Sequence, residues 1–135
     1  MTFSHQFTGG TTYFALTYPF SYSDGQGLLE QYEKKLTGST SIYFKRELLG
    51  YSIEKRRVDL ITISSFDGIE ATKEETIPEL FPSENAAEDR PNTFKEKEVV
   101  FATARVHPGE VQGSHMVNGL LAFLLKEFVF VQARY

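Results

Sequence analysis

Cysteine is absent from this 135-residue sequence, so the fold contains no disulfide bonds, which fits a reducing compartment. No apolar run approaches the ~20 residues of a membrane-spanning helix. The first residues lack the basic segment followed by an apolar block that marks a secretory signal. We therefore expect a soluble protein of the cytoplasm.

The sequence also lacks an excess of basic residues: it has 18 acidic and 14 basic residues, which give a formal net charge of −4. This argues against nucleic acid or an anionic membrane as a partner. Tryptophan is absent too, but 12 Phe and 7 Tyr residues predict aromatic packing between sheets and helices. The length suits one domain with its own core and is too short for two ordinary domains.

The stretch Phe101–Glu110 (FATARVHPGE) is typical of a buried strand that ends in a loop with two metal-ligand side chains. His107 offers an imidazole nitrogen and Glu110 a carboxylate three residues later, and both donor types suit Zn²⁺. Pro108 disfavours helical backbone for His107, and Gly109 permits a sharp bend that can turn both side chains to one point. A His-x-x-Glu pair is common by chance. Its place at the carboxyl end of an apolar strand is typical of sites in α/β proteins.

The first half of the chain predicts one helix followed by a hairpin. Ser23 and Gln26 have the spacing of a capping box, and apolar residues then recur at helical spacing. Residues 42–52 and 58–64 are typical of two antiparallel strands joined by a charged turn. The basic cluster Lys55–Arg57 in that turn is either a solvated turn, which we favour, or an anion site.

Two further segments among the first 98 residues give different predictions, one a strand and the other an irregular segment. Thr11–Tyr18 is rich in β-branched and aromatic residues and predicts a strand. From 65 to 98 the pattern dissolves into proline and glutamate, which predicts a partly disordered surface excursion.

The last third of the chain predicts a βαβ unit. Val99–Ala104 is nearly continuous in apolar residues, as a strand covered on both faces should be. An amphipathic helix over 114–126, with Ser114 as its N-cap, and a short strand over 128–131 follow it. With the hairpin, this unit gives an α/β fold with a mixed sheet in which Val99–Ala104 is central. An aspartate in place of Val100 should then cost several kcal/mol, since it would bury an unpaired charge.

Four segments also carry a family resemblance, and they occur in a fixed order along the chain: Tyr13–Asp24 (YFALTYPFSYSD), Tyr43–Tyr51 (YFKRELLGY), Val58–Ser64 (VDLITIS) and Thr103–Glu110 (TARVHPGE). The set resembles the cytosolic carboxypeptidases, zinc enzymes related to the pancreatic carboxypeptidases. The similarity extends from about Thr11 to Phe130, which is most of the chain.

The resemblance implies an incomplete, mixed-sheet zinc-carboxypeptidase-like α/β domain. Residues 1–20 would be the end of an N-terminal β-sandwich, with Thr11–Tyr18 as its remnant strand. Residues 21–135 would be the N-terminal part of the carboxypeptidase domain, interrupted by the surface excursion over 65–98.

The resemblance also makes His107 and Glu110 two ligands of a catalytic zinc. Such a zinc takes three protein ligands and keeps one position for water. In the family, the third ligand, the general-base Glu and the substrate-binding Arg residues follow the part that this chain resembles, so no catalytic residue is assigned here. His115, at a helix start, and His5, in a polar N-terminal segment, are weaker alternatives for the third ligand.

The function implied by the resemblance is zinc-dependent removal of glutamate from polyglutamylated proteins, tubulin foremost, including glutamate at branch points. The location implied is the cytosol, with the nucleus and microtubules as further places. The second hypothesis is a truncated, non-catalytic chain with at most a binding role. We expect this chain to bind zinc weakly, to release no glutamate, and to be marginally stable or to associate through its open sheet edge.

Overall fold

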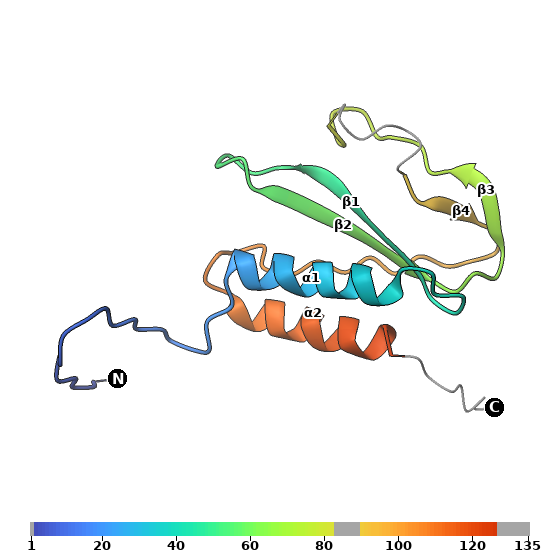
Figure 1. Cartoon of the computed structure of the whole chain (residues 1–135). Helices are drawn as coiled ribbons and strands as arrows, with labels where there is room; N and C mark the ends of the chain where they lie inside the picture. The colour runs from blue at the N-terminus through green and yellow to red at the C-terminus, as the bar shows by residue number, and fades with distance from the viewer. Residues whose placement is uncertain (1, 83–89, 127–135) are drawn as a thin grey trace.

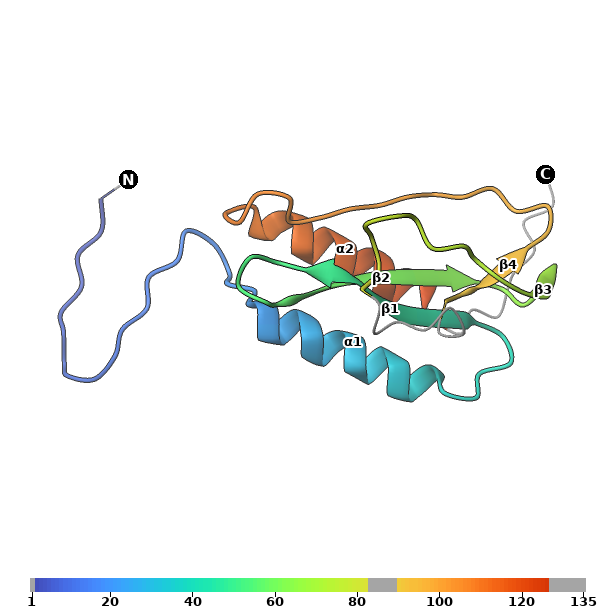
Figure 2. The same cartoon turned by 90° about the horizontal axis from the view of Figure 1, so that it is seen from above.

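The computed structural model describes residues 2–82 and 90–126 of the chain. Two helices lie against one face of a two-stranded hairpin, and a second small sheet lies beyond one end of it (Figures 1 and 2). The elements in chain order are α1 (Tyr22–Leu36), β1 (Tyr43–Tyr51), β2 (Arg57–Ser64), β3 (Ile69–Lys73), β4 (Asn92–Phe94) and α2 (Val111–Leu124). The α/β class is confirmed. Both sheets among the described residues are antiparallel pairs, so the mixed sheet is not present there.

The N-cap of helix α1 lies two residues earlier than the predicted cap at Ser23. Ser21 is the N-cap: its Oγ accepts a hydrogen bond from the Asp24 backbone N–H at 3.2 Å, and its own N–H donates to Asp24 Oδ2 at 2.8 Å. This reciprocal capping box satisfies two backbone donors, which is why the helix starts here. The same backbone and side-chain hydrogen bonds from Ser21 lower the pKa of Asp24.

The predicted hairpin is confirmed. β1 and β2 pair in antiparallel register from Tyr43↔Ser64 to Tyr51↔Arg57, with one extra residue, Leu49, bulging from β1. The connecting turn is exposed, and Arg56 in this turn pairs with its neighbour Glu54. This arrangement fits the solvated turn that the sequence favours over an anion site.

The hydrophobic core lies between the two helices and the hairpin. Leu36 at the end of α1 packs with Leu121 in the last turn of α2 and with Leu125, the residue that follows this helix, and all three are buried. Partly buried side chains from α1, the hairpin and α2 surround this cluster: Leu29, Tyr32, Ile42, Phe44, Ile63 and Val117. The helices are therefore held to the hairpin by one shared apolar cluster.

A buried polar network also ties α1 to the hairpin. Arg46 on β1 donates to Asp59 on β2 and to Glu33 on α1, both at 3.1 Å, and Gln26 donates to Asp59 at 2.8 Å. Burial alone would raise the pKa of Asp59. The hydrogen bonds from Arg46, Gln26 and Arg57 outweigh burial and hold that pKa below its ordinary value.

The segment predicted as a surface excursion contains ordered structure. β3 and β4 form an antiparallel pair in which Ile69 lies opposite Phe94. Arg90 forms a buried ion pair with Glu47 of β1, with side chains 6% and 1% exposed, and its guanidinium lies 3.8 Å from the centre of the Phe81 ring. The prediction missed this sheet because its contacts join residues more than fifteen positions apart. Residues 83–89 of the excursion lie outside the described part.

Two predicted strands are wrong. Thr11–Tyr18 is irregular and exposed, with Tyr13 and Leu16 at 89% and 95% exposure. Val99–Ala104 is also irregular, and Val99 and Val100 are 88% and 92% exposed rather than central. Both segments have strand-forming composition, but a strand needs hydrogen-bonded neighbours, and the described residues provide none for either. Because Val100 is exposed, an aspartate at this position would not be buried, and the expected loss of several kcal/mol does not apply.

Helix α2 begins three residues before the predicted start at Ser114. Glu110 occupies the N-cap position, without a side-chain capping hydrogen bond, and the helix ends at Leu124. The helix start lies close to the preceding segment: a Cβ at Gly113 would lie 3.4 Å from the Arg105 nitrogen. The strand predicted over 128–131 lies outside the described residues and stays a prediction.

Candidate metal centre

The loop between Ala104 and α2 is a compact turn held by its own backbone. The Glu110 N–H donates to the His107 carbonyl at 3.1 Å, and the Val111 N–H donates to the Gly109 carbonyl at 3.0 Å. These bonds fold the segment His-Pro-Gly-Glu back on itself and lead directly into α2. The bend expected from Pro108 and Gly109 is present.

Arg105 fixes this loop to two other parts of the molecule. Its Nε donates to the Pro108 carbonyl at 2.6 Å, while Nη1 donates to the Phe20 carbonyl at 3.1 Å and to Ser114 Oγ at 3.2 Å. Arg105 has a φ of 62°, a left-handed conformation that is uncommon for a residue with a side chain. The three hydrogen bonds stabilise that backbone and set the direction of the loop.

The loop brings the two predicted ligands together. His107 Nδ1 lies 2.8 Å from Glu110 Oε1, and the two side chains are 74% and 60% exposed. An imidazole nitrogen and a carboxylate oxygen thus meet at one accessible point. Because Glu110 makes no capping bond, its carboxylate is free of competing contacts with the helix start.

These two donors fit two positions of a zinc site. Zinc bonds to His and Glu are about 2.0–2.2 Å long, so two ligands of one tetrahedral ion lie roughly 3.3–3.5 Å apart. The observed pair is closer, at 2.8 Å, because the two atoms share a hydrogen bond, and a small side-chain rotation would separate them. Over residues 2–82 and 90–126, no group of three His, Cys, Asp or Glu side chains comes close enough to hold a metal ion.

The other two histidines lie elsewhere. His115 Nε2 is 3.3 Å from the Tyr18 carbonyl, and its ring packs edge-on against Phe20. His5 packs edge-on against Phe7 and Phe14 in the N-terminal segment. Neither is brought to the His107–Glu110 pair, so the structure gives no support to either as the third ligand.

The role of Arg105 was not found from the sequence. Its partners are two carbonyl oxygens and one hydroxyl, and carbonyls leave no trace in side-chain patterns. The only available signal was a basic residue inside an otherwise apolar stretch, two positions before a candidate ligand. That signal is too general to predict a loop clamp.

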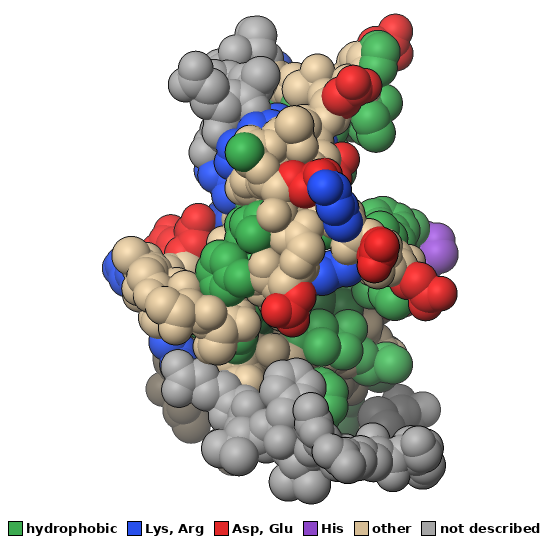
Figure 3. Space-filling view, turned by 90° about the vertical axis from the view of Figure 1, so that its right-hand side faces the viewer, with side chains coloured by type: hydrophobic (Ala, Val, Ile, Leu, Met, Phe, Trp, Pro, Cys, Tyr) green, Lys and Arg blue, Asp and Glu red, His purple; other side chains and the backbone are tan. Residues whose placement is uncertain are grey.

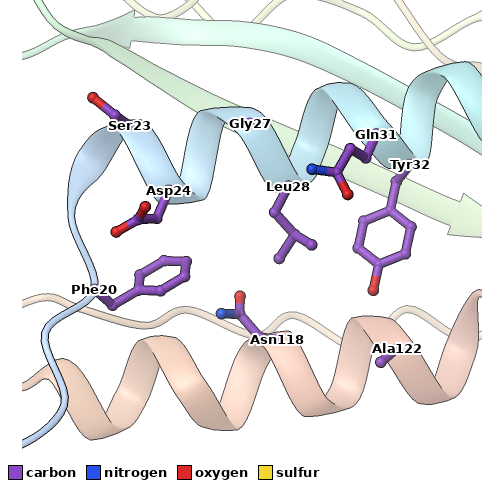
Figure 4. Close-up of a pocket in the computed structure, with 9 residues that line it drawn as sticks. All are labelled: Phe20, Ser23, Asp24, Gly27, Leu28, Gln31, Tyr32, Asn118 and Ala122. Carbon is purple, nitrogen blue, oxygen red and sulfur yellow. The ribbon is translucent and has the colours of Figure 1, made fainter.

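A separate cavity of about 550 Å³ lies between the two helices, away from the ligand pair. Figure 4 shows side chains of α1 facing α2 across it, with Asn118 projecting from the α2 side. Its lining residues are Phe20, Ser23, Asp24, Gly27, Leu28, Gln31, Tyr32, Asn118 and Ala122. The ligand loop contributes none of them, so this cavity is distinct from the candidate metal centre.

Comparison with known proteins defines the class of this chain. Residues 29–133 match the zinc carboxypeptidase family, peptidase M14, and the chain belongs to that family. The resemblance drawn from the four sequence segments is thereby confirmed.

Within this family, the chain is similar to individual cytosolic carboxypeptidases. The chain is 42% identical over 137 aligned residues to cytosolic carboxypeptidase-like protein 5 of Bos taurus, and equally to that of Homo sapiens. It is 35% identical over 114 residues to cytosolic carboxypeptidase 6 of Mus musculus. The alignments cover 93% of this chain in the first two cases and 84% in the third. They span only about 15% of the length of the first relatives, so the chain corresponds to a short part of them.

One further observation concerns membranes. In the portion that the structure describes, neither helix has the length and apolar character needed to cross a bilayer.

Proposed function

We propose that this chain supplies two zinc ligands, His107 and Glu110, to a carboxypeptidase that removes glutamate from polyglutamylated proteins. Tubulin is the first expected substrate, and branch-point glutamates are included. The observation that carries the proposal is the meeting of His107 Nδ1 and Glu110 Oε1 in a chain of the zinc carboxypeptidase family. The names of the relatives support a cytosolic location.

In this role, His107 would bind zinc as a neutral imidazole and Glu110 as a carboxylate. The metal would lower the pKa of a bound water and polarise the scissile carbonyl. Arg105 would act as a positioning residue, since it holds the loop that carries both ligands without contacting either. The exposure of both side chains leaves room for a further ligand and for the end of a peptide.

Zinc binding is the first test. Calorimetric titration of the 135-residue chain should give weak binding, and His107→Ala or Glu110→Ala should weaken it further. His115→Ala is the matched control, because it removes an exposed histidine that lies apart from the pair. Equal affinity in the original chain and in both ligand variants would overturn the assignment of these ligands.

Glutamate release tests the second candidate, a chain that binds without catalysis. This candidate is favoured because the described residues bring two ligand side chains together, whereas a catalytic zinc takes three. Purified chain with zinc and a polyglutamylated peptide should release no free glutamate. Release that disappears in Glu110→Ala would instead show that this chain is an enzyme by itself.

A further inference from the structure

The segment 18–20 (Tyr-Pro-Phe) joins the N-terminal segment to α1, and we call it the strap. Residues 2–19 are exposed, and Phe20, directly before the N-cap Ser21, is the first half-buried residue of the described chain. In Figure 1 the N-terminal segment leaves the molecule at the end where α1 and α2 begin, and the ligand loop lies at that same end. Figure 3 shows the other end, where hydrophobic side chains run through the middle below a more highly charged upper part.

Two carbonyl groups of the strap contact side chains on either side of the ligand pair. The Phe20 carbonyl accepts a hydrogen bond from Arg105 Nη1 at 3.1 Å, and the Tyr18 carbonyl lies 3.3 Å from His115 Nε2. Pro19, between them, has a fixed φ and disfavours helical backbone at Tyr18, so both carbonyls stay available to side chains. The strap is therefore bound both by a residue that precedes the ligand pair and by one that follows it.

The ring of Phe20 lies between the starts of the two helices. On the α1 side, a Cβ at Gly25 would lie 3.5 Å from Cε1 of the ring, and on the α2 side the ring packs edge-on against His115, with 5.6 Å between the ring centres. The backbone that follows is fixed as well, because Ser21 caps α1. The contact with His115 is an edge contact with one exposed ring, so Phe20 keeps its support on α1 even without it. These contacts fix the place of the Phe20 carbonyl.

The hydrophobic core is too distant to set the position of the ligand loop. Its buried residues Leu36, Leu121 and Leu125 lie at or just after the ends of the two helices, whereas the ligand loop leads into the start of α2. At the helix starts, the Phe20 ring and its carbonyl join α1, α2 and the loop. The strap therefore acts where the core does not.

We propose that Phe20 is a positioning residue of the candidate metal centre, which acts through Arg105 to set the direction of the loop that carries His107 and Glu110. One end of the Arg105 guanidinium is held by the Phe20 carbonyl, and its Nε donates to the Pro108 carbonyl, between the two ligands, at 2.6 Å. Because the guanidinium is planar and rigid, fixing one side of it directs the other. The role at a metal centre rests on the proposed function, whereas the contact with the loop can be tested without zinc.

Exchange of the Arg105 Nε–H with water, followed by NMR in the full chain without zinc, tests the contact. This N–H donates to the Pro108 carbonyl, so it is protected while the loop is held. Phe20→Ala keeps the carbonyl but removes the ring, and it should speed the exchange about two- to tenfold, as expected for one weakened hydrogen bond. Phe20→Leu restores an apolar contact with α1 and should recover most of the protection. Unchanged exchange in Phe20→Ala, with the amides of the β1–β2 ladder still protected, would overturn the proposal.

A second pair of variants leaves Phe20 itself unchanged. Gly25→Val places methyl groups against the Phe20 ring and should displace it, so the Arg105 Nε–H should exchange faster. Gly27→Val is the matched control: it makes the same substitution in the same helix, with the same cost in helix propensity, but a Cβ at Gly27 meets no atom within 4 Å. Equal exchange of the Arg105 Nε–H in the two valine variants would contradict the role of the ring.

Zinc titration then tests whether Phe20 acts through Arg105. Phe20→Ala alone should weaken zinc binding about two- to tenfold, in line with one weakened hydrogen bond. Added to Arg105→Ala, it should cause no further loss, because two residues that act through one contact are not additive. Additive losses would show that Phe20 acts independently of Arg105 and would overturn the proposal. If the original chain binds no zinc, the proposed function fails, and the exchange of the Arg105 Nε–H still decides whether Phe20 positions the loop.

Discussion

The α1–hairpin unit and the ligand loop are held in place by different means. The first is fixed by buried contacts: Arg46 and Asp59, whose side chains are 6% and 4% exposed, and the core around Leu36. The loop is fixed by three hydrogen bonds of the half-buried Arg105, and the segment that leads to it is exposed. The comparison teaches that a few hydrogen bonds from one side chain can shape a candidate site, without the buried ion pairs and apolar core that hold the α1–hairpin unit.

The largest expected loss in the free energy of unfolding comes from breaking the buried ion pair of Glu47, on the hairpin, with Arg90. Removing one partner by Arg90→Met leaves the other charge buried, which typically costs about 3–5 kcal/mol. Chemical denaturation followed by circular dichroism measures the free energy of unfolding.

The double variant Glu47→Leu/Arg90→Met serves as its control. Replacing both charges by apolar groups should recover most of the loss, because no unpaired charge remains. A single Arg90→Met variant as stable as the original chain would show that the pair does not stabilise this unit.

The next largest loss of stability is expected in α2, which follows the ligand loop and also contributes Leu121 to the core of the α1–hairpin unit. Leu121→Ala empties a site that is 8% exposed and should cost about 2–5 kcal/mol. Met116→Ala, at a site that is 76% exposed, should change the free energy of unfolding by less than about 0.5 kcal/mol. Equal losses in the two variants, measured by denaturant titration, would mean that the core lies elsewhere.

A smaller effect concerns the pH dependence of the α1–hairpin unit. The folded pKa of Asp59 is lowered, so its stabilising contribution is present above the unfolded pKa of about 3.9 and is lost as pH falls below it. Asp59→Asn should cost about 1.5–3 kcal/mol at pH 7, because hydrogen bonds to a charged group are replaced by neutral ones.

The measurement compares unfolding of the original chain and Asp59→Asn from pH 7 to pH 3. The difference between them should shrink as the pH falls below about 4. Asp67→Asn, an exposed carboxylate, is the control and should change little. A constant difference across the whole range would contradict the assigned role of the Asp59 charge.

The smallest effect is expected at the loop. Arg105→Ala removes three hydrogen bonds that position the ligand loop and should weaken zinc binding about tenfold, in the range for residues that orient metal ligands. Arg105→Lys keeps the charge but not the forked geometry, so it should rescue binding only in part. Calorimetric titration measures both. Unchanged affinity in Arg105→Ala would show that the backbone turn alone sets the loop.

Local patterns predicted local structure in this chain. The hairpin follows from strand composition on both sides of a charged turn, and α1 from helical spacing, although its cap is Ser21 rather than Ser23. Long-range pairing was not predictable in the same way. The β3–β4 ladder and the Glu47–Arg90 ion pair join residues far apart in the sequence, and no periodicity records such contacts.

The candidate site was predicted in part for the same reason. His107 and Glu110 are three residues apart around a Pro-Gly bend, so their approach depends on a short stretch of chain. The clamp by Arg105 depends on Phe20, 85 residues away, and on carbonyl groups that every residue carries. The failure of Val99–Ala104 as a central strand has another origin, since composition reports what a strand can bury and not whether its neighbours are in place.

The bulge at Leu49 has a consequence for how the hairpin can grow. Its carbonyl accepts a hydrogen bond from the Phe81 N–H at 3.0 Å, so at this point the outer side of β1 is already covered by the chain itself. A covered stretch of strand edge is a poor template for pairing with another strand. The two edges of the hairpin therefore differ: near the bulge an added strand is disfavoured on the β1 side, whereas within the described residues no other strand pairs with the β2 side.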